Sequence, residues 1–289
     1  MPNAVEPPTS SPRRLEDAFS LLADADGAPW RPLAGGTDLM VQLTGEIGEP
    51  PERVLDIWAL DELRGIAVDA DALVIGALTT YAEIRQSTVV AEVLPALADA
   101  AATIGAAQIQ NRGTLGGNVV NASPAGDTLP LLLATDAEMI LGSVRGERTV
   151  PASAFWPAYR TTARRDDELL LRIRIPLVAR RELRFRKIGT RRAQAISKVV
   201  MALAWRAGDG EAWQDVRLAL GSVAATTIRA PATEAVLEGA EPTRETAAGA
   251  ADALAAEIEP IDDVRSTADY RRAVAARVLH RLIRDEGGW

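Results

Sequence analysis

Cysteine is absent from the 289-residue chain, and histidine occurs once, at His280. The chain therefore has no disulfide, no catalytic thiol and no thiolate that could hold an iron–sulfur cluster. A single histidine also argues against a zinc site, and no nucleophile elbow accompanies it for a Ser-His-Asp triad. We expect no metal site, and we expect any chemistry to come from an organic cofactor.

Long apolar runs and an excess of basic residues are also missing. No stretch of about 18 apolar residues occurs, so no transmembrane helix is expected. The net charge of −8 argues against nucleic acid or an anionic membrane as the main partner. Residues 1–12 are rich in proline and serine and have no apolar core, which favours a disordered tail over a signal peptide. We therefore expect a cytoplasmic protein.

The predicted helices and strands divide the chain into a first lobe, a second lobe and a different C-terminal region. Its length suits about two domains on a prior of ~150 residues each. The C-terminal region reads as three strands followed by three helices, which indicates an α+β domain with helices on one face of an antiparallel sheet. These six elements are expected at residues 183–188, 198–205, 215–220, 231–237, 244–258 and 267–284.

A long glycine-containing stretch, residues 104–127, separates two apolar segments, and loops of this length inside a compact domain are usually functional. The pair Gly116-Gly117 can turn tightly and expose successive backbone N–H groups, which suits a diphosphate. A second pair, Gly35-Gly36, stands before a predicted helix whose N-terminus adds a positive dipole end. Neither block is a GxGxxG or a P-loop. The plainer alternatives are a strand-to-helix turn at residues 34–38 and, for Asp127, a helix cap.

Three blocks in this order and spacing carry a resemblance to a known family. They are AGGTDLM (34–40), QIQNRGTLGGN (108–118) and ASPAGD (122–127). Together they resemble the FAD-binding subunit of molybdenum hydroxylases, the family that includes xanthine dehydrogenase and carbon monoxide dehydrogenase. The resemblance implies an α+β protein. A two-lobed FAD-binding domain of the vanillyl-alcohol-oxidase/PCMH type would span 13–178, with lobes at about 13–60 and 61–178. A C-terminal α+β domain with a small antiparallel sheet and helices would follow at 179–289.

The same resemblance implies a set of cofactor-binding residues and assigns no catalytic side chain. The first block would line the diphosphate and ribityl chain, the second would hold the diphosphate and neighbouring ribose, and Asp127 would contact FAD as an acceptor. Leu170 and Ile104 would pack near the flavin, with Lys187 as a nearby cation; a strand-edge lysine is the plainer alternative. The full set is Leu33, Ala34, Gly35, Gly36, Thr37, Asp38, Leu39, Met40, Ile104, Thr114, Leu115, Gly116, Gly117, Asn118, Asp127, Leu170 and Lys187.

The function implied is electron relay through noncovalently bound FAD. In this family a large subunit carries the molybdenum cofactor and a small subunit carries two 2Fe-2S clusters, so a dimer of heterotrimers is expected. Gln194 stands where the xanthine dehydrogenase pattern has an acidic residue near the flavin, which leaves NAD, a quinone or another acceptor open. A self-contained flavin oxidase and a flavin-free scaffold subunit are the alternatives. The sequence does not indicate which substrate is hydroxylated, because in this family the substrate binds the molybdenum subunit.

Overall fold

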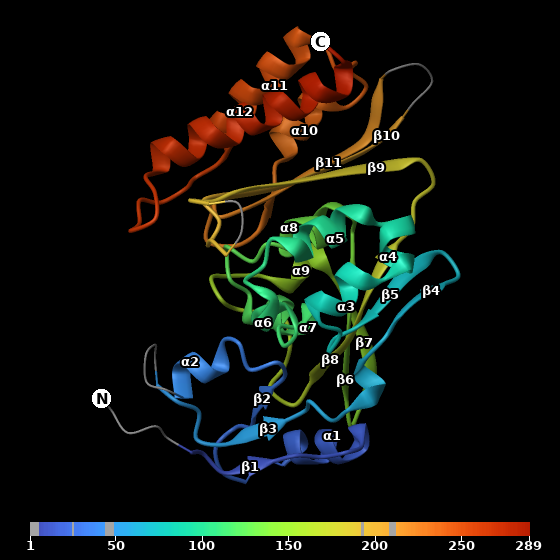
Figure 1. Cartoon of the computed structure of the whole chain (residues 1–289), viewed down its shortest axis with the longest axis vertical. Coiled ribbons are helices and arrows are strands. Elements are labelled where there is room, and N and C mark those ends of the chain that lie inside the picture. The colour runs from blue at the N-terminus through green and yellow to red at the C-terminus, as the bar shows by residue number, and fades with distance from the viewer. Residues whose placement is uncertain (1–5, 25, 44–48, 192–193, 208–211) are drawn as a thin grey trace.

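The computed structural model describes residues 6–24, 26–43, 49–191, 194–207 and 212–289, which form three sheets with helices around them (Figure 1). The N-terminal sheet is parallel, in the order β1-β3-β2. Its strands and helices are β1 (Thr9–Ser10), α1 (Leu15–Ala23), β2 (Arg31–Leu33), α2 (Leu39–Leu43), β3 (Val54–Asp56) and the 3-10 helix η1 (Asp61–Leu63). The predicted disordered tail is therefore wrong at β1, which pairs with β3, while residues 1–5 of that tail lie outside the described residues.

The central sheet is antiparallel, in the order β4-β5-β8-β6-β7. Its strands are β4 (Ile66–Asp69), β5 (Ala72–Gly76), β6 (Glu138–Ser143), β7 (Gly146–Pro151) and β8 (Leu169–Pro176). The helices of this lobe are α3 (Tyr81–Gln86), α4 (Thr88–Val93), α5 (Pro95–Ala102), α6 (Ala107–Gln110), α7 (Leu115–Asn121), α8 (Leu129–Ala134) and α9 (Ala152–Phe155). The β6–β7 hairpin turns at Gly146, whose φ of 99° favours glycine.

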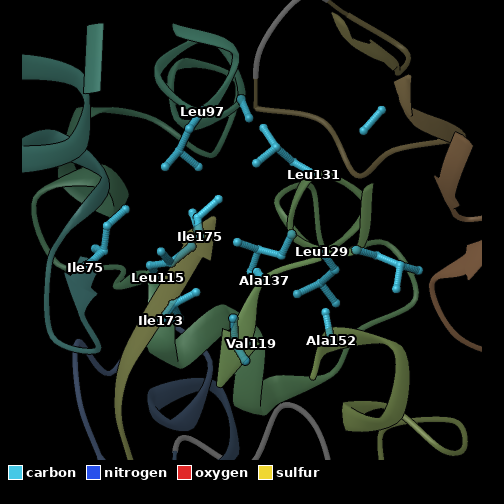
Figure 2. Close-up of a cluster of buried hydrophobic side chains, with 14 of the residues drawn as sticks. Ile75, Leu97, Leu115, Val119, Leu129, Leu131, Ala137, Ala152, Ile173 and Ile175 are labelled. Atoms are coloured by element: carbon cyan, nitrogen blue, oxygen red, sulfur yellow. The ribbon is translucent and has the colours of Figure 1, made fainter. Parts of the chain in front are cut away.

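The core of this lobe lies between the central sheet and its helices (Figure 2). On β8, Ile173 and Ile175 alternate with partly exposed arginines, and the two isoleucines project toward Leu115 of α7. All three side chains are fully buried. Because α7 is anchored by its apolar side, Gly117 and Asn118 are turned away from the core, whereas Gly116 is buried. No helix in the described part of the chain is long and apolar enough to cross a membrane.

The C-terminal sheet is antiparallel, in the order β12-β11-β10-β9. Its strands are β9 (Arg181–Ile188), β10 (Val199–Ala207), β11 (Trp213–Gly221) and β12 (Ile228–Arg229), followed by α10 (Pro231–Leu237), α11 (Arg244–Glu257) and α12 (Ala268–Gly287). The predicted α+β class, with helices against a small antiparallel sheet, is confirmed.

Both faces of this sheet are buried, which goes beyond the single helix-covered face that the sequence predicted. On β10, Val200 and Ala202 belong to the core of the central lobe, whereas Met201 and Leu203 belong to the core beneath α10, α11 and α12. Helices α5 and α8 of the central lobe cover the second face (Figure 1). This sandwich explains why β10 is a continuous apolar run. It also holds β9 and the end of α5 side by side, next to the site described below.

Candidate cofactor site

A cavity of about 290 Å³ lies between the first two lobes and is bounded by both glycine blocks. Most of the predicted cofactor-binding residues share it. Those that line it are Leu33, Ala34, Gly35, Gly36, Thr37, Asp38, Leu39, Ile104, Thr114, Gly116, Gly117, Asn118 and Leu170. The cavity is therefore a single place at which segments more than 130 residues apart in the chain could hold one elongated molecule.

The first glycine block supplies free backbone donors. β2 leads directly into it, and Gly36 adopts a φ of 80°, which side chains disfavour. Among the described residues, the backbone N–H groups of Gly35, Gly36, Thr37 and Asp38 have no hydrogen-bond partner. Gly35, Gly36 and Thr37 are half-buried, where N–H groups are nearly always paired, so their unpaired donors indicate a bound acceptor; Asp38 is exposed. Successive amides of this kind suit the oxygens of a diphosphate.

The second glycine block does not supply free amides, so the expectation that it would is wrong. The N–H of Gly117 donates to the Thr114 hydroxyl at 3.0 Å, and the N–H of Gly116 donates to the Ala77 carbonyl at 3.0 Å. The N–H groups of Leu115 and Asn118 are also paired with backbone oxygens. These bonds begin helix α7 with Thr114 as its N-cap, as hydroxyl residues commonly do.

What the second block offers is space. Gly117 is exposed within the cavity, and a Cβ built there would meet only the Thr114 hydroxyl, at 2.9 Å. Gly116 is buried against Ala77, whose Cβ and carbonyl oxygen would each lie 2.6 Å from an added Cβ. Gly116 therefore permits α7 to pack closely against Ala77. Gly117 leaves that side of the cavity free of side-chain atoms. Free amides in the first block and open space beside Gly117 in the second block fit a flavin dinucleotide.

The two blocks are held against each other directly. The backbones touch at Gly35, because an added Cβ would lie 1.7 Å from the Arg112 carbonyl oxygen. The Arg112 guanidinium donates to the Gly35 carbonyl at 3.3 Å and stacks on the Trp58 ring at 3.9 Å. Asn121 donates its side-chain amide to Asp38 at 3.0 Å. These contacts fix the width of the cavity before any ligand enters.

Asp127 and Lys187 are placed together, outside the cavity lining. Lys187 Nζ lies 2.6 Å from Asp127 Oδ2 and donates to the Thr103 carbonyl at 3.1 Å, while the Ser197 hydroxyl donates to Asp127 Oδ1. Burial raises the pKa of Asp127, and the Lys187 ammonium and the Ser197 hydroxyl partly oppose that rise. The alternative that Asp127 caps α8 is wrong, since the N-cap is Thr128 and has no side-chain cap bond. Direct contact of either residue with FAD stays a prediction.

Three other predicted positions also lie outside the lining. Leu115 is fully buried in the core, and Met40 is 50% exposed on α2. Gln194 is exposed at a φ of 55°, and its carbonyl accepts from the Arg191 guanidinium at 3.0 Å. The sequence pattern of the first block could not show that Met40 points away from the cavity while Leu39 lines it. In a helix each successive side chain is rotated by about 100°.

Sequence reasoning missed several residues that line the cavity. They are Arg31, Pro32, Ile57, Ala77, Leu78, Tyr81, Ile109, Gly113, Val120, Asn121, Arg164 and Leu169. Asn121 could have been found, since it lies between two of the quoted blocks. Tyr81 follows the Thr80 capping box, and burial raises the pKa of its phenol. Arg164 had no such signal, because the pair Arg164-Arg165 looks like an ordinary solvated surface.

Glu168 supports the loop that carries Arg164. Its carboxylate is 3% exposed and receives two hydrogen bonds of 2.7 Å from the Arg148 guanidinium and one of 2.8 Å from the Arg165 N–H. Burial alone would raise its pKa, but these donors outweigh burial and lower it. A carboxylate with a depressed pKa in the folded state stabilises the protein above its unfolded pKa and loses that contribution as pH falls.

We expect Glu168→Gln to lower the free energy of unfolding at pH 7 by about 2 kcal/mol, the usual value for hydrogen bonds to a charged group. The difference from the unsubstituted protein should shrink between about pH 5 and pH 3, as Glu168 itself becomes protonated. Urea unfolding across this range measures it. Asp166→Asn, which changes a 92% exposed carboxylate of the same loop, is the control. A deficit independent of pH would contradict the ionic explanation.

A second prediction concerns the pair Asp127–Lys187, whose side chains are 9% and 6% exposed. Lys187→Met leaves a buried carboxylate without its cation and is expected to cost about 3 kcal/mol of stability near pH 8. Because the folded-state pKa of Asp127 is raised, protonation favours the folded state, so the cost should decrease as pH falls toward 5. The double variant Asp127→Asn, Lys187→Met should recover most of the loss in denaturant titrations. Equal deficits for the single and double variants would refute the ion-pair account.

Comparison with known proteins now bears on this site. Residues 5–178 match the family model described as the FAD binding domain in molybdopterin dehydrogenase, and residues 184–285 match the CO dehydrogenase flavoprotein C-terminal domain. The chain belongs to the FAD-binding subunits of the molybdenum hydroxylases. The predicted family is thus confirmed, and with it FAD as the cofactor and an oxidoreductase subunit as the type of protein.

Relatives of the whole chain agree with this assignment. The carbon monoxide dehydrogenase medium chain of Hydrogenophaga pseudoflava is 34% identical over 278 residues, covering 94% of each chain. The xanthine dehydrogenase FAD-binding subunit of Escherichia coli O157:H7 is 30% identical, covering 95% of each. Among solved structures, carbon monoxide dehydrogenase from Hydrogenophaga pseudoflava superposes with a TM-score of 0.90 at 33% identity, over 96% of both chains. Quinoline 2-oxidoreductase from Pseudomonas putida 86 gives 0.91 at 26% identity, over 99% and 98%. These matches also support the predicted two-part architecture.

Proposed function

We propose that this chain is the electron-relay subunit of a heteromeric molybdenum hydroxylase. Its FAD would take electrons from an iron–sulfur subunit and pass them to a soluble or quinone acceptor. The observation that carries the proposal is the run of four unpaired amides, Gly35 to Asp38, in the same cavity as the open space beside Gly117. The relatives support it, since they are named as medium chains or FAD subunits of such dehydrogenases.

Each part of this site has a task that follows from its geometry. The amides of the first block would bind the diphosphate, and the contact between Gly35 and Arg112 would fix the separation of the two loops. Apolar lining at Ile104, Ile109 and Leu170 would exclude water from the ring system. FAD, when bound, supplies reversible acceptance of two electrons. None of the chain's own side chains is required to form a bond with it.

The donor must lie on another polypeptide, because the 289 residues contain no cysteine for an iron–sulfur cluster. The described residues also contain no group of three or more metal-ligating side chains. We therefore infer a small iron–sulfur subunit and a large molybdenum subunit as partners, assembled as a dimer of heterotrimers in the cytoplasm. The acceptor is set by the surface near the flavin. Gln194, which lies outside the cavity lining, is neutral, so NAD, a quinone or another acceptor are all compatible with it.

The test is co-expression of the chain with the products of its neighbouring genes. The complex should contain iron, molybdenum and noncovalent FAD together, with one FAD per copy of this chain. The chain purified alone should release FAD on acid precipitation and turn over no organic substrate. A lone chain that oxidises an organic substrate at enzymatic rates would instead favour a self-contained oxidase, and a chain that never takes up flavin would favour a scaffold.

A further inference from the structure

The cavity carries two arginines that neither the glycine blocks nor the family motifs account for. Arg31 begins β2, three residues before the first block, and Arg164 lies in the loop before β8. Both line the cavity. The only lining carboxylate among the described residues is Asp38, and it accepts a hydrogen bond from Asn121. The cavity therefore has two cationic side chains against one carboxylate that is already engaged.

Arg164 is held in place by its own loop. Its Nη1 donates to the carbonyls of Arg165 at 2.7 Å and Glu168 at 2.8 Å, and to that of Asp166 at 3.3 Å. The side chain is 13% exposed. Burial lowers the pKa of Arg164, and the Arg31 charge lowers it further, while the carboxylates of Asp166, Glu168 and Asp167 oppose that decrease. Two cationic side chains thus line the same cavity, where they would attract an anionic ligand.

One part of the lining is uncharged and contains an aromatic ring. Gly113, Ile109 and Tyr81 adjoin one another, since a Cβ on Gly113 would lie 3.0 Å from the Ile109 carbonyl oxygen and 3.4 Å from the Tyr81 ring. Neither arginine belongs to this group. An uncharged ring system suits the apolar part, and the charged half of a dinucleotide suits the part with the arginines. A guanidinium can also stack on a planar base.

We propose that Arg164, together with Arg31, recognises the ADP half of FAD and makes the pocket selective for the dinucleotide. The proposal deepens the assigned cofactor site and rests on it. Arg164 contributes a preorganised cation, because its three carbonyl contacts fix the guanidinium before the ligand binds. Arg31 contributes the second charge next to the free amides of the first block. Hydrogen bonds to charged groups contribute about 1.5–3 kcal/mol, which corresponds to roughly a 10- to 100-fold change in affinity.

The experiment uses the full chain stripped of flavin, with FAD binding followed by flavin fluorescence and ADP binding followed by competition. Arg164→Leu is expected to weaken FAD and ADP by the same factor, about tenfold or more. Riboflavin binding should not change. Arg164→Lys should recover part of the loss. Arg165→Leu, which changes the neighbouring 61% exposed arginine outside the lining, should bind all three ligands normally.

Arg31→Leu is the second variant, in case Arg164→Leu fails to fold. It should not disturb folding, because the Arg31 side chain makes no hydrogen bond to any described residue. It should weaken FAD and ADP in parallel, though less than the Arg164 variant does. Weaker FAD with unchanged ADP would place the arginines at the flavin half and overturn the proposal, as would unchanged affinity for both. If the unsubstituted chain itself binds no FAD, it is the assigned cofactor site that fails.

Discussion

Gly117→Val is expected to yield a folded, colourless protein that has lost more than 100-fold in FAD affinity, or about 3 kcal/mol. Gly117 lies in the first turn of α7 with an ordinary helical φ, so the backbone accepts a side chain. The added atoms would enter the cavity, since only the Thr114 hydroxyl lies near the Cβ position. The melting temperature should fall by no more than about 4 °C. Flavin absorbance per chain and circular dichroism measure the two effects.

The neighbouring glycine supplies the contrast for this experiment. Gly116→Ala places a Cβ 2.6 Å from the Ala77 carbonyl oxygen and should damage folding before it affects the cofactor. Gly117→Ala should fold nearly as well as the natural chain, because only the Thr114 hydroxyl at 2.9 Å must shift and alanine is the better helix former, and it should bind FAD more weakly. A Gly117→Val protein with a full flavin complement would show that the cofactor does not occupy the space beside Gly117.

The glycine blocks were the part of the site that the sequence could reveal. Glycine and small polar residues at fixed spacing report backbone requirements, and those requirements are local. The pattern therefore pointed to Leu33–Met40 and Thr114–Asn118, of which all but Met40 and Leu115 line the cavity. Where apolar periodicity is strong, the elements were predicted closely, and the helix at Pro231–Leu237 is one example. The expectation of a long loop at 104–127 was wrong, because α6 and α7 lie within it.

Contacts between distant segments could not be predicted. Whether the amides of Leu115 and Gly116 are free depends on the carbonyls of Thr79 and Ala77, which only the fold brings there. Lys187, the partner of Asp127, lies 60 residues away on β9, and no local pattern indicates that the two side chains meet. Arg164 enters the cavity for the same reason. Side chains acquire these roles from the packing of three lobes, which local sequence patterns do not reveal.

Gly35→Ala is the substitution from which we expect the largest combined loss. The Cβ would lie 1.7 Å from the Arg112 carbonyl oxygen and 2.5 Å from its carbonyl carbon, both of them backbone atoms. No rotamer change relieves such an overlap, so the first block must move away from the second. We expect a destabilisation of about 3 kcal/mol, at the upper end for overpacking, and a fall in melting temperature of roughly 6–12 °C. FAD should be undetectable after gel filtration, because the free amides would no longer face the second block.

Gly249→Ala is the matched control, since Gly249 lies within α11 and its Cβ would meet Val236 at an ordinary 3.7 Å. That variant should keep its flavin and gain about 0.5–1 kcal/mol of stability from the better helix former. The pair separates the cost of any added methyl group from the cost of one placed between the loops. If Gly35→Ala kept both its melting temperature and its flavin, the two blocks would not be in backbone contact in solution. The fixed width of the cavity, on which selection of an extended dinucleotide depends, would then have no structural basis.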